Sequence, residues 1–585
     1  MSQLSAYEAR LRARRAAEQF RFAKKQDAPL RVCLAYANRY PVAMGNLGFQ
    51  TVYELFDRAD GVVCERAFLP DEADDAALGR GALRTLESGR RVTDCDVLAL
   101  SISFETDYLN VPRLLDLAGL PARRRARDAS APLVLAGGPA VFLNPEPIAD
   151  FVDLFLIGEA EEMLPELLAL LREWPPRGGD RAGLLAAAAV QVAGSYVPEH
   201  FAPRFDGPVT AALEHRGPGP ARVERRLIWD LNRFETTTRV LNDEAVFGDM
   251  VMVEASRGCQ WGCRFCAAGY MYRPIRTRDP DGLAGSVERG LADRSTIGLV
   301  GAEMASVPGV DRLSELASAR GGRLSPSSLK ADCVTPRLAA VLAQGGTRSV
   351  TVAPEAGSER MRRVINKNLG EEDILRAADL LVGEGVQHLK LYFMIGLPTE
   401  VEHDVLEIAG LAARIRARLT AGGRERRRVG AVTISLNPFV PKPWTPFQWD
   451  PMDPIPRLKQ KVQLLTRAVG RAPNTKLDVE SPREAYLQAV LSRGDRRVSH
   501  FIDAVHAAGG DWWSTLRTWR RDGLADLPPP DAYVHRTYDD GERLPWDFID
   551  HRIDKRYLAV ERRKAFAARQ TAPCDTATCE SCAAC

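Results

Sequence analysis

The chain has 585 residues, which is too long for one hydrophobic core and indicates two to four packed units. Its 45% hydrophobic and 27% charged residues exclude a largely disordered, collagen-like or disulfide-scaffold chain. The 79 Lys and Arg residues nearly balance the 77 Asp and Glu residues, so the formal charge is only +2 and no strong overall attraction to nucleic acid is expected.

The cysteines point to metal ligation. There are 11 of them, an odd number, and seven lie in two tight clusters, which suits metal binding in a reducing compartment better than a disulfide framework. The most apolar stretch, 184–197, is interrupted by Gln191, Gly194 and Ser195, so no membrane span is expected. The N-terminus lacks the short apolar segment of a secretory signal. The sequence therefore predicts a cytoplasmic protein with no membrane partner.

Residues 31–175 are predicted to form a doubly wound parallel sheet. Five short apolar runs alternate there with helical stretches, and runs that are apolar at consecutive positions are typical of strands buried on both faces. The runs are 31–36, 61–64, 96–101, 132–136 and 151–157. An Arg-rich helix over residues 1–30, to which we assign no function, is predicted to precede them.

The loops at the carboxyl ends of these strands are rich in glycine. Ligands bind at this edge of a doubly wound sheet, and glycine permits close approach of the backbone to a flat ligand. No G-x-G-x-x-G follows the first strand, so a dinucleotide site is not expected. For any single loop, a tight turn is an equally good interpretation. The candidate ligand contacts are Asn46, Gly48, Ser101, Phe104, Gly137, Gly138, Asn144, Gly158 and Glu159.

A second α/β series is predicted over residues 246–450. Its six strands are expected at 249–254 and near Ile297, Arg323, Ser349, His388 and Val432. Six units are too few to close an eight-stranded barrel, so an open, partial (β/α)6 barrel fits better. Residues 176–245 are predicted to connect the two α/β units, with a hairpin near Tyr196, and residues 451–568 are predicted to be mainly helical.

The strongest chemical signal is Cys259-Gln-Trp-Gly-Cys263-Arg-Phe-Cys266, directly after the first strand of the second series. Clustered thiolates are ligands of iron-sulfur clusters or structural zinc, and three of them leave one metal position open for a substrate or cofactor. Zinc would normally recruit a fourth Cys or His, and this segment contains no His, so an iron-sulfur site is favoured. Trp261 and Phe265 lie between the thiols, where they either keep water from a cluster or pack against the barrel.

These residues resemble the radical S-adenosylmethionine (SAM) enzymes. In that family a C-x3-C-x2-C loop after the first barrel strand binds a 4Fe-4S cluster, whose fourth iron is chelated by the amino and carboxylate groups of SAM. Segments 300–303, 353–358 and 393–400 resemble the family's SAM-binding segments in the same order, although Ala302 departs from the family's Gly-Gly-Glu pattern. The resemblance implies SAM contacts at Phe265, Gly301, Glu303, Glu355, Ser358, Ile395, Gly396 and Pro398.

The predicted N-terminal sheet resembles the cobalamin-binding domain that precedes many radical SAM barrels, through its Gly-Gly-x6-Pro-Glu loop. The resemblance implies that the nine loop residues named above contact cobalamin. The chain lacks the D-x-H-x-x-G segment that supplies a histidine to cobalt in other cobalamin proteins, as is usual for the radical SAM subgroup. Over residues 31–585 it is similar to a poorly characterised bacterial subgroup, through the segments 363–367 (Arg-Val-Ile-Asn-Lys), 390–398 and 440–449.

The tail, residues 569–585, carries a second group of thiols at Cys574, Cys579, Cys582 and Cys585. Four thiolates are enough to complete a closed metal site. A second 4Fe-4S cluster and zinc both accept four sulfurs, so the sequence does not choose between them. A tail with free thiols is the remaining interpretation.

The resemblance implies that a reduced cluster passes one electron to SAM and so produces a 5'-deoxyadenosyl radical, which abstracts hydrogen from a substrate. With cobalamin on the N-terminal sheet, the prediction is methyl transfer to a substrate that the sequence does not identify, with a flavodoxin or ferredoxin as electron donor. Two alternatives stay open: radical SAM chemistry without methyl transfer, and a non-catalytic iron-sulfur carrier or RNA-binding protein. The last would use the basic runs 123–127 and 424–428, although such runs are more often solvated loops.

Overall fold

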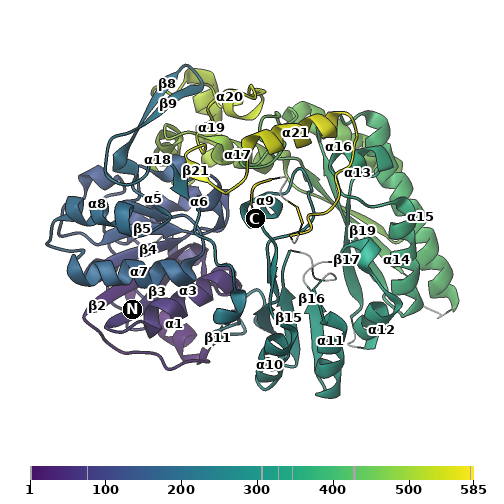
Figure 1. Cartoon of the computed structure of the whole chain (residues 1–585), viewed down its shortest axis with the longest axis horizontal. Coiled ribbons are helices and arrows are strands. Elements are labelled where there is room, and N and C mark those ends of the chain that lie inside the picture. Colours follow the sequence, from purple (N-terminus) through teal and green to yellow (C-terminus); the bar gives the residue numbers. More distant parts are fainter. Residues whose placement is uncertain are drawn as a thin grey trace.

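The protein has the mixed α/β fold expected from its sequence. The computed structural model describes residues 3–75, 77–302, 304, 307–326, 329–344, 347–425, 430–576, 578–579 and 582–584. Figure 1 shows the N-terminal α/β region at the left and the second series at the right, with the C-terminal helices along the top of both. Within the described part of the chain, no helix is long and apolar enough to cross a membrane.

The N-terminal region is built on a six-stranded sheet. Its order is β3-β2-β4-β5-β6-β7, in which all neighbours are parallel except β6 and β7. The hairpin expected near Tyr196 lies later in the chain, because Tyr196 itself belongs to the edge strand β7. The strands are β2 (Leu30–Arg39), β3 (Val62–Leu69), β4 (Val97–Ser101), β5 (Leu133–Gly137), β6 (Leu154–Leu156) and β7 (Ser195–Tyr196), and the hairpin is β8 (Phe201–Asp206) with β9 (Val209–His215).

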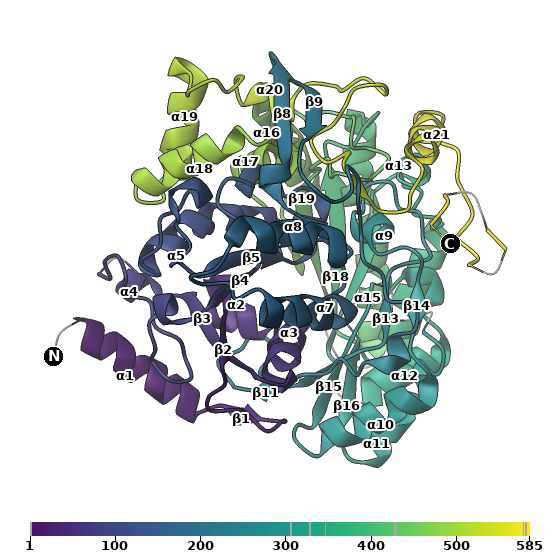
Figure 2. The same ribbon diagram turned by 60° about the vertical axis from the view of Figure 1, so that its left-hand side comes forward.

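Helices lie on both sides of this sheet. Figure 2 shows α5 (Val111–Leu117) on one side of the strands and α3 (Leu47–Arg58) and α7 (Ala160–Glu173) on the other. Every residue of β3 is buried, as expected for a strand covered on both faces. Because the first strand, β2, lies between β3 and β4, the carboxyl ends of β2 and β4 form a switch point, where ligand crevices occur in such sheets. The remaining helices of the region are α2 (Tyr40–Met44), α4 (Glu72–Asp75), α6 (Pro139–Leu143) and α8 (Arg181–Gln191).

The second series contains two parallel sheets. Their orders are β12-β15-β16 and β17-β18-β19-β20, and a parallel bridge between Leu329 and Val352 joins the segment after β16 to β17. The six expected strands are present in the expected sequence, but β20 is an additional strand in a region that we expected to be helical. The strands are β12 (Val251–Glu254), β15 (Thr296–Val300), β16 (Arg323–Pro326), β17 (Ser349–Glu355), β18 (His388–Ile395), β19 (Ala431–Pro438) and β20 (Thr475–Val479).

Helices connect these parallel strands, as parallel pairing requires crossover connections. They are α10 (Pro280–Leu291), α11 (Val310–Ala319), α12 (Pro336–Gln344), α13 (Glu359–Val364), α14 (Glu371–Gly383), α15 (Glu402–Glu425) and α16 (Ile455–Val469). The carboxyl ends of parallel strands lie at one edge of their sheet. The loops after β12 and β15 therefore lie at the same edge of one sheet, and the loops after β17 and β18 lie at the same edge of the other.

The N-terminal segment and one helix of the C-terminal region contact the N-terminal sheet region. Near the C-terminus, α18 contacts α5, and Asp503 of α18 pairs with Arg123. At the N-terminus the predicted helix over residues 1–30 is shorter than expected, because β1 (Gln19–Phe20) pairs with β11 (Val240–Leu241). The elements are α1 (Gln3–Ala16), β10 (Val223–Glu224), α17 (Pro482–Arg493), α18 (Val498–Ala507), α19 (Trp512–Asp522), α20 (Asp531–Val534), β21 (Ile549–Asp550) and α21 (Lys555–Phe566).

Candidate active site

The three clustered cysteines lie on a loop closed by a small hairpin. β13 (Ser256–Arg257) pairs antiparallel with β14 (Arg276–Thr277), and between them lie residues 258–267, the cluster loop, followed by α9 (Ala268–Met271). Gly258 has φ of +89°, and a Cβ there would lie 2.5 Å from the carbonyl oxygen of Tyr272, so the loop requires glycine at its start. All three thiols are half-buried.

Segment 363–367, whose role was not evident from the sequence, supports the cluster loop. The buried guanidinium of Arg264 donates to two carbonyl groups of this segment at 3.0 and 2.8 Å, and its backbone N–H donates to a third at 3.0 Å. The Asn366 amide donates to the carbonyl oxygen of Gly262 at 3.1 Å. Arg264 also pairs with Glu561 of α21 at 3.0 Å. The backbone of the cluster loop is therefore fixed from two distant parts of the chain.

Burial and a nearby lysine act in opposite directions on the charge of the clustered thiols. Burial raises the pKa of Cys263 to about 11, while the nearby positive charge of Lys367 acts in the opposite direction. Metal ligands must lose their protons, so iron would displace the thiol protons on binding. Among the described residues, no three Cys, His, Asp or Glu side chains converge on one ion site. In a 4Fe-4S cluster each thiolate binds a different iron, so the donor set fits that cofactor without such convergence.

Most residues expected to contact SAM lie around the ends of β15, β17 and β18. Glu355 ends β17 and pairs with Lys367 at 3.2 Å. Ser358 caps α13 and donates to Asp404 at 2.5 Å, so its hydroxyl already has a structural role. Ile395 is the last residue of β18, and Gly396 and Pro398 follow it. Phe265 packs in a cluster with Ala356 and Leu397, which brings the cluster loop against β17 and β18. Gly301 follows β15 and lines a cavity beside the N-terminal sheet. Glu303 lies outside the residues that the structure describes.

A cavity of about 780 Å³ lies between the N-terminal sheet and the start of the second series. Its volume is in the range of small-molecule sites, and its lining is mainly apolar with a few polar groups. Seven of the nine residues expected to contact cobalamin line it: Asn46, Gly48, Ser101, Gly137, Gly138, Gly158 and Glu159. Phe104 and Asn144 do not. The Phe104 ring is exposed, and the Asn144 amide donates to the carbonyl groups of Ser492 and Gly494 instead.

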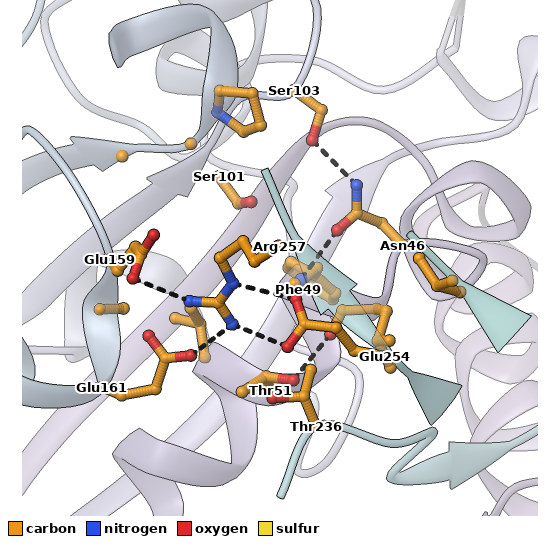
Figure 3. Close-up of a pocket in the computed structure, with 18 of the residues that line it drawn as sticks. Asn46, Phe49, Thr51, Ser101, Ser103, Glu159, Glu161, Thr236, Glu254 and Arg257 are labelled. Atoms are coloured by element: carbon orange, nitrogen blue, oxygen red, sulfur yellow. Dashed lines mark hydrogen bonds and ion pairs between the residues drawn. The ribbon is translucent and has the colours of Figure 1, made fainter. Parts of the chain in front are cut away.

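The cavity wall joins both α/β regions. Figure 3 shows Asn46 donating to Ser103 at 3.0 Å on one side and Arg257, the residue two positions before Cys259, on the other. Ser256 also lines the cavity, is buried, and has a hydroxyl oxygen without a hydrogen-bond partner in the part of the chain that the structure describes. A bound ligand would supply that partner. The cavity thus offers apolar walls with a few hydrogen-bonding groups, which suits a cofactor that has both apolar and polar parts.

Two of the glycines that were expected to contact cobalamin are required by close contacts within the protein backbone. Gly138 has φ of +117°, and a Cβ there would lie 2.4 Å from the carbonyl oxygen of Ile102. At Gly158, with φ of +129°, a Cβ would lie 2.4 Å from the backbone of Arg226. These glycines are required because neighbouring loops approach closely, independently of any ligand.

Arg257 connects the N-terminal sheet to the first strand of the second series, a role that sequence reasoning missed. Its guanidinium contacts Glu159 at 3.2 Å and Glu161 at 2.8 Å on one side, and Glu254 at 3.0 Å on the other. These four charged groups form the arginine bridge (Figure 3). The position of Arg257 beside the Cys triplet was the available signal, but its partners are not predictable from local sequence.

Glu159 was expected to contact a cofactor, but its carboxylate is occupied by protein groups. Arg276 donates to both of its oxygens, at 2.7 and 2.8 Å, and the backbone N–H of Ile228 donates at 2.8 Å. Burial by itself raises the pKa of Glu159, but the hydrogen bonds from Arg276 and the charge of Arg257 outweigh burial and lower it. Glu159 therefore acts as a buried anion that holds the two regions together.

The Cys-rich tail returns to the cluster loop. The backbone N–H of Cys574 donates to the carbonyl oxygen of Gln260 at 2.8 Å, and the backbone N–H of Thr571 donates to Asn366 at 2.8 Å. Cys579 is half-buried and Cys582 is buried, whereas Cys585 lies outside the described residues. The two groups of cysteines, separated in sequence by about 300 residues, are thus neighbours in the fold.

Two arginines of the basic run 123–127 have carboxylate partners within the fold. Arg123 pairs with Asp150 at 2.6 Å, and Arg127 pairs with Asp153 at 2.9 Å. The side chains of the other run, 424–428, all lie outside those that the structure describes. Arg123 and Arg127 thus serve the packing of the fold, which removes part of the observation that favoured RNA binding.

Both α/β regions match models of known protein families. Residues 48–198 match the family described as radical SAM proteins, N-terminal, and residues 253–412 match the radical SAM superfamily. Together the two matches span more than half of the chain and include the cluster loop. The chain belongs to the radical SAM superfamily and is a radical SAM enzyme, and this membership implies a 4Fe-4S cluster and SAM.

Individual relatives extend the similarity over most of the chain. An uncharacterized protein, MJ0966 of Methanocaldococcus jannaschii, is 29% identical over 72% of this chain and 82% of its own length. Another, MK0932 of Methanopyrus kandleri, is 27% identical over 65% of this chain and 75% of its own. Among solved structures, the radical SAM methyltransferase TsrM of Kitasatospora setae, with cobalamin and a 4Fe-4S cluster bound, is 14% identical. It matches with a TM-score of 0.50 over 82% of this chain and 99% of that one, so the likeness concerns the fold.

Replacing Glu159 with Gln is expected to destabilise the protein and to flatten its pH dependence. The substitution leaves the buried Arg276 without its anion, which costs about 3–5 kcal/mol in the free energy of unfolding. Because the folded-state pKa of Glu159 is lowered, its stabilisation is fully present above the ordinary Glu pKa of about 4.3 and is lost as the pH falls through the folded-state value. Urea midpoints of wild type and E159Q at pH 7 and over a series of pH values below about 4.3 measure both effects.

The matched control for this experiment is Glu72→Gln. The Glu72 side chain is 82% exposed and pairs with Arg39 at the surface, so its loss is expected to change the stability by less than about 1 kcal/mol. Equal midpoints for E159Q and E72Q at pH 7 would show that the arginine bridge does not stabilise the fold.

Proposed function

We propose that the protein is a cobalamin-dependent radical SAM methyltransferase that acts on a substrate still to be identified. The observation that carries the proposal is the cavity, which lies at the switch point of the N-terminal sheet and is lined on its other side by Ser256, Arg257 and Gly258 at the start of the cluster loop. A cofactor in this cavity would lie beside the cluster loop. The fold likeness to TsrM, whose structure contains both cobalamin and a cluster, supports the same arrangement.

In this proposal residues 31–175 form a cobalamin-binding unit and residues 246–450 form an open radical SAM barrel. The bridge between Leu329 and Val352 supports a barrel, because it connects the two parallel sheets of the second series. Cys259, Cys263 and Cys266 hold the cluster. The ends of β15, β17 and β18 provide Gly301, Glu355, Ile395 and Gly396 beside it for SAM.

When bound, the cluster supplies the electron that cleaves SAM, and cobalamin carries the methyl group. The chain's own contribution is to position both and to exclude water. Phe265 packs against the apolar cluster that contains Leu397, and Asn46, Ser101 and Ser256 give the apolar cavity polar groups. Reduction requires an electron donor, and we expect a cytoplasmic flavodoxin or ferredoxin.

In the tail, Cys574, Cys579, Cys582 and Cys585 form a second metal site in this proposal. Their four thiols match the donor set of a second 4Fe-4S cluster or of zinc. The hydrogen bond from the Cys574 backbone N–H to the cluster loop supports a position next to the first site.

Replacing Cys259, Cys263 and Cys266 together with Ala should abolish the formation of 5'-deoxyadenosine from SAM, because the cluster then has no protein ligands. The measurement is product analysis of anaerobically reconstituted protein supplied with dithionite. Cys64→Ala, which removes a buried cysteine of β3, is the control and should retain the product. Deoxyadenosine formation by the triple variant would remove the radical SAM assignment of this loop.

Replacing Ser101 with Trp should block cobalamin binding, because the indole would fill the cavity at the end of β4. Ser101→Ala, which removes the hydroxyl group without filling the cavity, is the matched control. The measurement is corrinoid absorbance that co-elutes with the protein after anaerobic incubation with hydroxocobalamin. Iron content should be equal in the two variants. Undiminished corrinoid binding by S101W would contradict the cavity as the cobalamin site and would favour radical chemistry without methyl transfer.

Replacing all four tail cysteines with Ala should remove a second complement of metal. If the tail holds a 4Fe-4S cluster, iron should fall from about eight to about four atoms per chain; if it holds zinc, one zinc should be lost while iron stays at about four. Elemental analysis of anaerobically isolated protein distinguishes the two. Iron and zinc contents identical to those of wild type would mean that the tail binds neither.

A further inference from the structure

A lysine and a glutamate form a largely buried ion pair beside the cluster loop. Lys367 Nζ lies 3.2 Å from Glu355 Oε1, and the two side chains are 12% and 16% exposed. Glu355 ends β17, and Lys367 is the last residue of segment 363–367. The pair therefore comes from the two chain segments that flank α13.

The geometry of this pair is fixed relative to the cysteines. Asn366, next to Lys367, donates to the carbonyl oxygen of Gly262 at 3.1 Å, and the preceding residue, Ile365, accepts from the backbone N–H of Arg264 at 3.0 Å. Glu355 and Asn366 both have positive φ, 65° and 55°. Residues other than glycine rarely adopt this conformation, so the surrounding structure holds both positions.

The two charges act on the same thiols with opposite sign. Lys367 favours, and Glu355 disfavours, the negatively charged forms of both Cys263 and Cys266. A second cation, Lys330, lies 3.7 Å from the ring centroid of Trp261 in the cluster loop and pairs with Asp332. Each of these two lysines thus has a carboxylate partner.

We propose that Lys367 and Glu355 are positioning residues that set the reduction potential of the cluster, Lys367 raising it and Glu355 lowering it. Reduction adds one negative charge to the cluster, and a nearby cation stabilises that charge while a nearby carboxylate destabilises it. Both side chains are largely shielded from water, so screening of their charges is reduced. This inference rests on the proposed function only in that Cys259, Cys263 and Cys266 must hold a cluster.

The test compares reduction potentials without SAM, because Glu355 is also a candidate SAM contact. The protein, with its cluster reconstituted, is titrated anaerobically with dithionite and redox mediators, and the reduced cluster is quantified by electron paramagnetic resonance. Lys367→Met should lower the equilibrium constant for reduction at least tenfold, which is a shift of about 59 mV for one electron. Glu355→Gln should raise it by a similar factor, and the double variant should lie between the two.

Two further variants separate charge from structure. Lys367→Arg keeps the charge and should retain a potential near that of wild type. Lys476→Met removes a lysine whose side chain is 71% exposed on β20 and should leave the potential unchanged. If K367M does not assemble a cluster, E355Q still decides the matter, because Gln is nearly isosteric with Glu.

The outcomes separate this inference from the proposed function. A wild-type protein that binds no cluster at Cys259, Cys263 and Cys266 overturns both. A cluster that forms but keeps the wild-type potential in E355Q, or shifts in the same direction in E355Q and K367M, overturns the assignment of Lys367 and Glu355 alone. Opposite shifts, with K367R near wild type, support it.

Discussion

The arrangement of this protein depends on a buried network of ion pairs centred on Arg257. Arg257 lies between Glu159 and Glu161 of the N-terminal region and Glu254 of β12, and its side chain is largely buried with theirs. A buried charge that loses its partner destabilises the folded protein. Removing any member of the arginine bridge is therefore expected to leave a buried charge without part of its compensation. The consequence is geometric: the residue that fixes the N-terminal sheet against the second series is also two positions before Cys259. Arg257 therefore both lines the cavity and fixes the start of the cluster loop.

The sequence predicted those strands and motifs that are encoded by a pattern of neighbouring residues. Buried parallel strands appear as continuous apolar runs, and the Cys triplet is a short pattern directly after such a run. β20 was missed because Thr475–Val479 alternates polar and apolar residues and includes a lysine and an aspartate, so it lacks the apolar run of a buried strand. The helix predicted over residues 1–30 was too long because pairing between β1 and β11 joins residues more than 200 positions apart.

The predictions for single site residues were least reliable where long-range contacts decide the role. The composition of a turn does not separate ligand contacts from structural ones. Glu159 illustrates this, because it lines the cavity, yet its oxygens accept from Arg276 and from the backbone of Ile228. Asn144 serves contacts to the end of α17 and the residue after it instead of the cavity. Segment 363–367 was recognisable as a motif, but only the fold brings it against the cluster loop.

The supports of the cluster loop act on its backbone and on the side chain of Arg264. Segment 363–367, α21 and the tail all bind its backbone or the Arg264 side chain, through contacts that do not use the three thiols. Phe265 meanwhile packs toward residues that follow β17 and β18. Groups that are held in place before a charge develops need little reorganisation, and the backbone contacts of this loop favour such preorganisation. The sulfurs are thus carried by a rigid frame, and the charges of Lys367 and Glu355 act on them from fixed positions.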